Sequence, residues 1–160
     1  MTGSKYGKYI VTELKKNIEL PDFRPKENIG QGELDGVRRR MEHVIWMDSE
    51  VVPGSFYSEC VWFWPGQDPT PEQLEEMSNG GGPQAHTHPF DEVITFFGTN
   101  FEDPHDLGGE IELWLEDEKF VLTKSFLAYI PAWMKHCPLK ILRIDRPIFH
   151  FTLGPGKMYG

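Results

Sequence analysis

The chain has 160 residues, of which 39% are hydrophobic and 13% aromatic, and it carries 16 Lys and Arg against 25 Asp and Glu. These values are typical of one globular domain and exclude a disordered chain. The net charge of −9 repels polyanions, and the densest basic run, Arg38 to Arg40, lies between Asp35 and Glu42. We therefore expect no nucleic-acid partner.

The sequence also lacks the features of membrane and secreted proteins. No apolar stretch approaches the ~20 residues of a membrane helix, and residues 1–9 lack the apolar centre of a secretory signal. The two cysteines, Cys60 and Cys137, form no CxxC pair and are most simply small buried hydrophobes. We expect a cytoplasmic protein with no membrane partner.

The first forty residues differ in character from the rest of the chain. Residues 1–40 are polar and are interrupted by Pro21 and Pro25, although residues 9–11 favour a short edge strand. We expect this arm to pack on the body of the protein or on a second subunit. Residues 41–160 then form the main domain.

In that domain, short runs of β-branched and aromatic residues alternate with turn-forming residues. They predict strands at 43–47, 55–64, 84–88, 92–97, 110–115, 119–123, 126–130, 140–144 and 148–153. Thr70 as N-cap and Pro71 at the first helical position predict one short helix, which runs to about residue 77. Without helices between the strands a parallel sheet is excluded, so we expect an all-β antiparallel barrel or jelly roll.

Three histidines are spaced as metal ligands. His86 and His88 are two residues apart, so on a strand both imidazoles project to one face and can reach one ion at ~2.0–2.1 Å. Glu92 opens the next predicted strand, and an antiparallel return would bring its carboxylate to the same ion. His136 adds an imidazole from a distant strand. A lone HxH is weak evidence, but these residues together favour a metal site.

The residues around these histidines follow two motifs of a known superfamily. The first motif is a glycine, five residues, His-x-His, three or four residues, Glu, about six residues and a glycine. Its positions are taken by Gly80, His86, His88, Glu92 and Gly98, with one residue fewer before the last glycine. In the second motif Pro131 and His136 match, whereas Ser125 and Trp133 stand in place of glycines. From residue 55 to 153 the sequence resembles the cupin superfamily.

The resemblance implies a jelly-roll barrel that holds one metal ion by His86, His88, Glu92 and His136. Trp133 is the main departure, because a turn with positive φ costs a bulky residue energy. Its indole is also a candidate neighbour of the site.

This ligand set favours catalysis. Three imidazoles and one carboxylate leave two positions open on an octahedral divalent ion, and they suit Fe, Mn, Ni, Co, Cu or Zn. The first hypothesis is an enzyme that acts on a small molecule, either as an oxygenase or by isomerase, lyase or hydrolytic chemistry, with Glu92 as a ligand that also serves as a base. The alternative is a binding or structural protein that uses the metal without turnover.

Further residues are candidates for the wall of the substrate pocket. They are Trp62, Trp64, Phe96, Trp133 and Met134, each of which is more often plain core. His150 is either a base that faces the barrel interior or a hydrogen-bonded core histidine. Because cupin barrels commonly pair through edge strands, we expect a homodimer.

Overall fold

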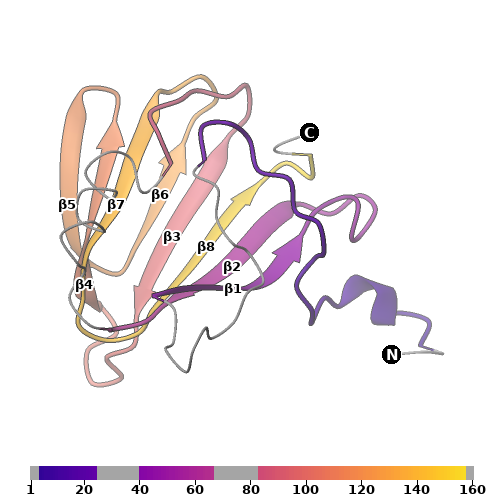
Figure 1. The fold of residues 1–160 in the computed structure, drawn as a ribbon, viewed down its shortest axis with the longest axis horizontal. Helices are drawn as coiled ribbons and strands as arrows, with labels where there is room; N and C mark the ends of the chain where they lie inside the picture. The colour runs from indigo at the N-terminus through magenta and orange to yellow at the C-terminus, as the bar shows by residue number, and fades with distance from the viewer. Residues whose placement is uncertain (1–3, 25–39, 67–82, 158–160) are drawn as a thin grey trace.

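The computed structural model describes residues 4–24, 40–66 and 83–157, and Figure 1 shows the fold. The elements in chain order are a 3-10 helix η1 (Gly7–Tyr9) and the strands β1 (Met41–Met47), β2 (Tyr57–Phe63), β3 (Glu92–Gly98), β4 (Asp106–Leu115), β5 (Glu118–Lys124), β6 (Phe126–Ile130), β7 (His136–Ile144) and β8 (Ile148–Gly154). The helix expected at 70–77 and Gly80 of the first motif lie outside the described residues. Within those residues, no helix is long and apolar enough to cross a membrane.

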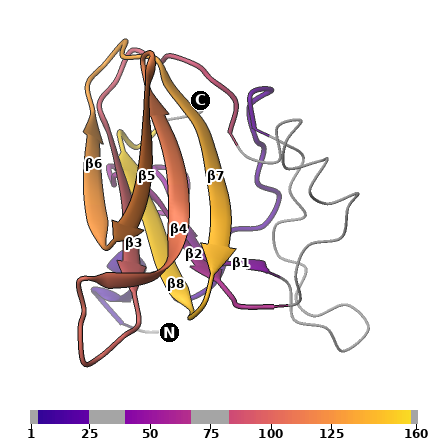
Figure 2. The same ribbon diagram turned by 90° about the vertical axis from the view of Figure 1, so that its left-hand side faces the viewer.

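The strands form two antiparallel sheets, which face each other as separate layers in Figure 2. One sheet has the order β1-β2-β8-β3-β6 and the other β5-β4-β7. The predicted all-β antiparallel fold is therefore confirmed.

Two expected strands are absent from the described residues. Residues 84–88 make a single bridge between His86 and His136, because Pro83 and Pro89 cannot donate to a longer ladder. At 9–11, Tyr9 ends η1 and the next two residues are irregular. The N-terminal edge strand proposed from sequence is thus not formed within residues 4–24.

The hydrophobic core lies between the two sheets. Every second residue of these strands points inward, for example Val61 and Phe63 on β2 and Ile94 and Phe96 on β3. They meet inward residues of β4 such as Ile111, which is completely buried. This alternation also decides which polar side chains enter the interior.

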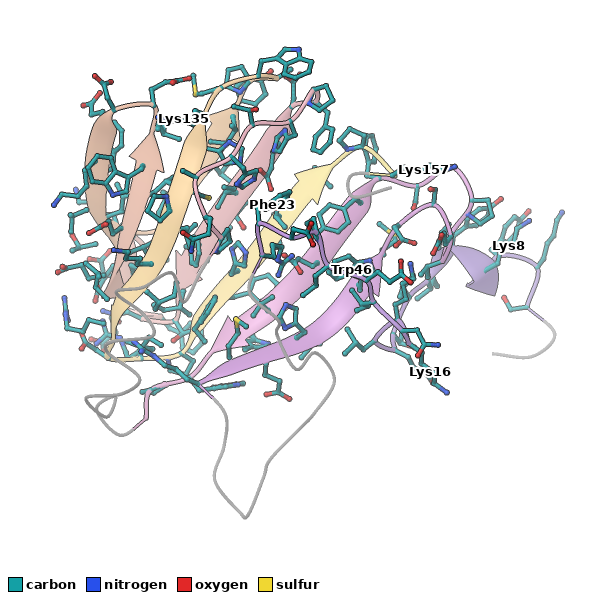
Figure 3. All side chains as sticks on the ribbon, turned by 45° about the horizontal axis from the view of Figure 1, so that its top comes forward. Lys8, Lys16, Phe23, Trp46, Lys135 and Lys157 are labelled. Carbon is teal, nitrogen blue, oxygen red and sulfur yellow. The ribbon has the colours of Figure 1, made fainter. Side chains whose placement is uncertain are left out.

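The described part of the N-terminal arm packs on the same chain. Leu14, Ile18 and Leu20 cover a small cluster made by Trp46 and Tyr57, and Figure 3 labels Trp46 on β1 beneath the arm. Lys15 lies on the outside of this contact and donates to Asp48 at 2.7 Å. The arm is thereby attached where β1 ends and β2 begins.

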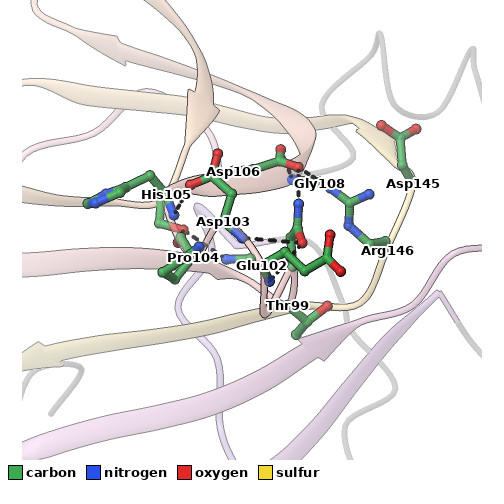
Figure 4. Close-up of polar contacts among 12 residues, drawn as sticks. Thr99, Glu102, Asp103, Pro104, His105, Asp106, Gly108, Asp145 and Arg146 are labelled. Atoms are coloured by element: carbon green, nitrogen blue, oxygen red, sulfur yellow. Dashed lines mark hydrogen bonds and ion pairs between the residues drawn. The ribbon is translucent and has the colours of Figure 1, made fainter.

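A polar network lies at the end of β3 where the strand stops at Gly98, and Figure 4 shows part of it. Asp106 accepts a hydrogen bond from the amide of Gly108 at 2.9 Å and is paired with Arg146. Ser125, which replaces a motif glycine, accepts a hydrogen bond from the Gly98 amide at 3.0 Å through Oγ. Gly98 lies so close to the Asp106 carbonyl that a Cβ there would overlap it.

We predict that Gly98→Ala lowers the free energy of unfolding by about 1–3 kcal/mol, because the added methyl group must displace backbone. Urea denaturation measures the change. Gly66→Ala is the matched control, since a Cβ at Gly66 meets no atom within 4 Å. Equal stability of the two variants would contradict the predicted overlap.

Candidate metal centre

Backbone contacts between the two motif regions bring the candidate ligands together. His86 and His136 exchange two backbone hydrogen bonds of 3.1 Å, and the Trp133 amide donates to the His88 carbonyl at 2.8 Å. The Ala132 amide donates to Asp91 Oδ1 at 2.8 Å. The turn between β6 and β7 is therefore attached to the segment that precedes β3, where Glu92 begins the strand.

Trp133, which stands where the motif has a glycine, has a left-handed backbone conformation. Its φ is 69°, and the Met134 amide closes the turn on the Pro131 carbonyl at 3.1 Å. The left-handed conformation costs a non-glycine residue energy, which the hydrogen bond to His88 offsets. The side chain is 69% exposed, so the indole lies mainly in solvent.

The three histidines have their ring tautomers set by backbone carbonyls. Nδ1 of His86 lies 2.6 Å from the Gln84 carbonyl, Nδ1 of His88 lies 2.8 Å from that of Phe90, and Nδ1 of His136 lies 3.0 Å from that of Met134. A carbonyl oxygen only accepts, so each Nδ1 carries the proton. In the neutral ring each Nε2 then has a lone pair available to an ion.

The three imidazoles lie close together, and two of them contact Glu92. The ligand atoms of His86, His88 and His136 lie within 4.8 Å of one another. Oε2 of Glu92 is 3.1 Å from Nε2 of both His88 and His136. At this distance Nε2 of His88 and of His136 must either carry a proton that is donated to the carboxylate or share a cation with it. The residues present therefore fit a metal ion.

The Glu92 carboxylate is ionised although it is 94% buried. Burial raises its pKa, but contacts with His136, His88 and Thr152 outweigh this and lower the pKa to about 2. Thr152 on β8 donates to Oε1 at 2.8 Å, which leaves Oε2 directed at the imidazoles. Thr152 thus orients the carboxylate as a ligand.

The site opens into a cavity of about 80 Å³ between the sheets. The arm closes part of it, because the Phe23 ring stacks on His86 with 3.9 Å between centroids. Phe23 is labelled in Figure 3 on the segment that lies across the sheets. The wall is mostly apolar and includes Val61, Phe63, Ile94 and Leu139.

Sequence reasoning missed a second group of polar residues in this cavity. Arg24 Nη1 donates to Glu59 Oε1 at 2.9 Å, and His43 Nε2 lies 3.4 Å from Glu59 Oε2. All three are buried and line the cavity. The available signal was Glu59, a lone carboxylate on the face of β2 that Val61 and Phe63 make apolar. Nothing in the irregular arm indicated that Arg24 would reach it.

The candidates for the pocket wall fall in different places. Phe96 and His150 line the cavity. Trp62 lies on the outer face of β2 and contacts Phe149, and Trp64 just beyond the strand stacks on Trp62. The cavity is lined by Glu59, Val61 and Phe63, which point to the opposite face of β2, so the two tryptophan side chains point away from it. Met134 packs against the core and does not line the cavity. Trp133 is exposed and does not line it either.

Comparison with known proteins finds solved structures of low sequence identity. No protein-family model and no curated protein matches the sequence. An RmlC-like cupin from Shewanella frigidimarina is 14% identical, with a TM-score of 0.42 over 86% of this chain and 94% of that one. A predicted oxalate decarboxylase from Thermotoga maritima is 10% identical, with a TM-score of 0.43 over 72% of this chain and 77% of that one.

A third match is the DMSP lyase DddQ from Ruegeria pomeroyi, 18% identical with a TM-score of 0.37 over 67% of this chain. The match spans 41% of that lyase. All three structures are below 20% identical to this chain and have TM-scores below 0.5, and one of them is described as an RmlC-like cupin.

We predict that Thr152→Val lowers metal affinity by about 10–100-fold, because Glu92 loses the hydroxyl that orients it. Competition with a chelator of known affinity measures the change. Thr95→Val is the matched control, since the Thr95 hydroxyl bonds the backbone of Phe151 and not Glu92. Equal metal affinity in the two variants would contradict the role of Thr152.

Proposed function

We propose that this protein is a cupin enzyme that binds one divalent transition metal through His86, His88, Glu92 and His136 and acts on a small molecule. The observation that carries the proposal is the convergence of three histidines, two of which place Nε2 3.1 Å from one buried carboxylate oxygen. We further propose that the two sheets close as a jelly-roll barrel around the site. Elemental analysis of the purified protein would identify the metal among Fe, Mn, Ni, Co, Cu and Zn.

When bound, the metal would supply a Lewis acid or a redox centre with open coordination positions, which suits dioxygenase-like, isomerase or lyase chemistry. The chain's own residues would hold and shield the reacting group. Thr152 orients Glu92, Phe23 covers His86, and Phe96 and its apolar neighbours exclude water from the cavity. Glu92 is placed to take up a proton at Oε2 if it leaves the ion.

A non-catalytic protein that uses the metal to bind a small ligand is the alternative function. The small cavity and its cover by Phe23 favour this alternative. We also propose a cytoplasmic location, supported by two cysteines that are not bonded to each other.

We predict that protein purified without chelator or affinity-tag nickel contains close to one equivalent of a transition metal. His86→Ala should lose most of it because one of three imidazoles is gone. Elemental analysis measures the content, and His105→Ala is the control, since His105 is exposed in a loop. Less than about a tenth of an equivalent in the wild type would contradict the metal site.

An oxygen-uptake screen over small acids and phenols separates the branches of the proposal. Uptake that depends on Fe(II) and is abolished in His86→Ala selects the oxygenase. Turnover without oxygen uptake selects isomerase or lyase chemistry. Binding without turnover for any metal selects the non-catalytic alternative.

We propose that two copies pair through the outer face of the five-stranded sheet. Trp62 and Phe149 are in contact on this face, and Phe97 stacks on Phe151. Leu127 is 66% exposed beside them. Apolar side chains on several neighbouring strands of one sheet face support a contact with a second copy.

We predict that light scattering gives twice the chain mass of 18.5 kDa. Leu127→Glu should shift the protein towards the monomer because it buries a charge in the pairing surface. Val121→Glu on β5 is the matched control, since Val121 is 47% exposed on the other sheet. A monomeric mass for the wild type would refute the dimer.

A further inference from the structure

The cavity contains a second polar group beside the metal ligands. Nδ1 of His150 lies 2.6 Å from the Thr95 carbonyl, so it carries the ring proton and leaves the lone pair on Nε2. The ring stacks on Phe96 with 4.3 Å between centroids and lines the cavity. Burial lowers the pKa of His150, which keeps the ring neutral. Within the described residues this is its one hydrogen bond.

Glu59 presents an acceptor to the same cavity. Its Oε1 accepts a hydrogen bond from Arg24 at 2.9 Å, whereas the nearest donor to its buried Oε2 among the described residues is His43 Nε2 at 3.4 Å, a contact that does not meet the geometry of a hydrogen bond. Burial raises the pKa of Glu59, but the charge of Arg24 and the nearby His43 lower it to about 2. An ionised carboxylate only accepts hydrogen bonds, so Oε2 requires a donor.

The surroundings make these two acceptors costly to leave unpaired. Val61, Phe63 and Ile94 form the wall around them and offer no hydrogen-bond donor from their side chains. A buried acceptor without a donor loses the hydrogen bonds that it makes in water. A donor brought by a ligand would restore them.

We propose that Glu59 Oε2 and His150 Nε2 form a subsite that shares the single proton of a hydroxyl group of a small hydroxy acid whose carboxylate lies at the histidine centre. This rests on the proposed function, which supplies the metal for the carboxylate. A neutral hydroxyl fits better than an ammonium group because Arg24 already balances the charge of Glu59. The cavity volume of about 80 Å³ favours a small ligand.

The test measures binding to the zinc-loaded full chain by calorimetry, with butyrate, 3-hydroxybutyrate, 4-hydroxybutyrate and 4-aminobutyrate as probes. We expect one hydroxy acid to bind at least about tenfold more tightly than butyrate, as a hydrogen bond to a charged acceptor provides. In His150→Leu and Glu59→Gln this preference should fall towards one, with butyrate affinity nearly unchanged. His105→Leu, in an exposed loop, should keep the preference.

A second readout does not depend on any variant. The Nε2 nitrogen resonance of His150 should shift when the preferred hydroxy acid is added and stay constant with butyrate. Equal affinity of the wild type for butyrate and both hydroxy acids would overturn the subsite, and tighter binding of 4-aminobutyrate would overturn the neutral donor. Butyrate binding that is the same with and without zinc would instead overturn the proposed metal function.

Discussion

The burial of one ionised carboxylate constrains the whole site. Glu92 stays charged between the sheets because His88, His136 and Thr152 surround it. These residues come from the segment before β3, the start of β7 and β8, so the carboxylate is satisfied only when separate parts of the chain are in place. Fold and site therefore depend on each other, since a buried charge without these contacts costs several kcal/mol.

The residues closest to the motifs could be predicted from sequence. The two-residue spacing of His86 and His88 and the antiparallel return to Glu92 both follow from strand geometry, and the structure brings their side chains together. Trp133 was identified as a departure that needs a positive φ, and the structure has it. Glu92 and His136 begin β3 and β7, but the predicted strand at 84–88 is reduced to one bridge at His86, so the grouping is correct although one of the expected strands does not form.

The rest of the cavity depends on information that the sequence pattern lacks. Both faces of β2 carry large apolar side chains, so parity alone could not decide whether Trp62 or Val61 points inward. Only the packing of the second sheet against β2 makes that choice. Arg24 reaches Glu59 from 35 residues away through an irregular arm, for which no periodicity exists. Long-range ion pairs of this kind have no local signature.

The stacking of Phe23 on His86 links the arm to the metal ligands. An ion that fixes the His86 ring would favour the arm in its closed position, and by thermodynamic reciprocity a closed arm would raise the affinity of the ring for the ion by the same factor. The described part of the arm, through Phe23, would then be part of the affinity of the site. A chain that lacks Phe23 would keep the same ligands and bind the ion more weakly.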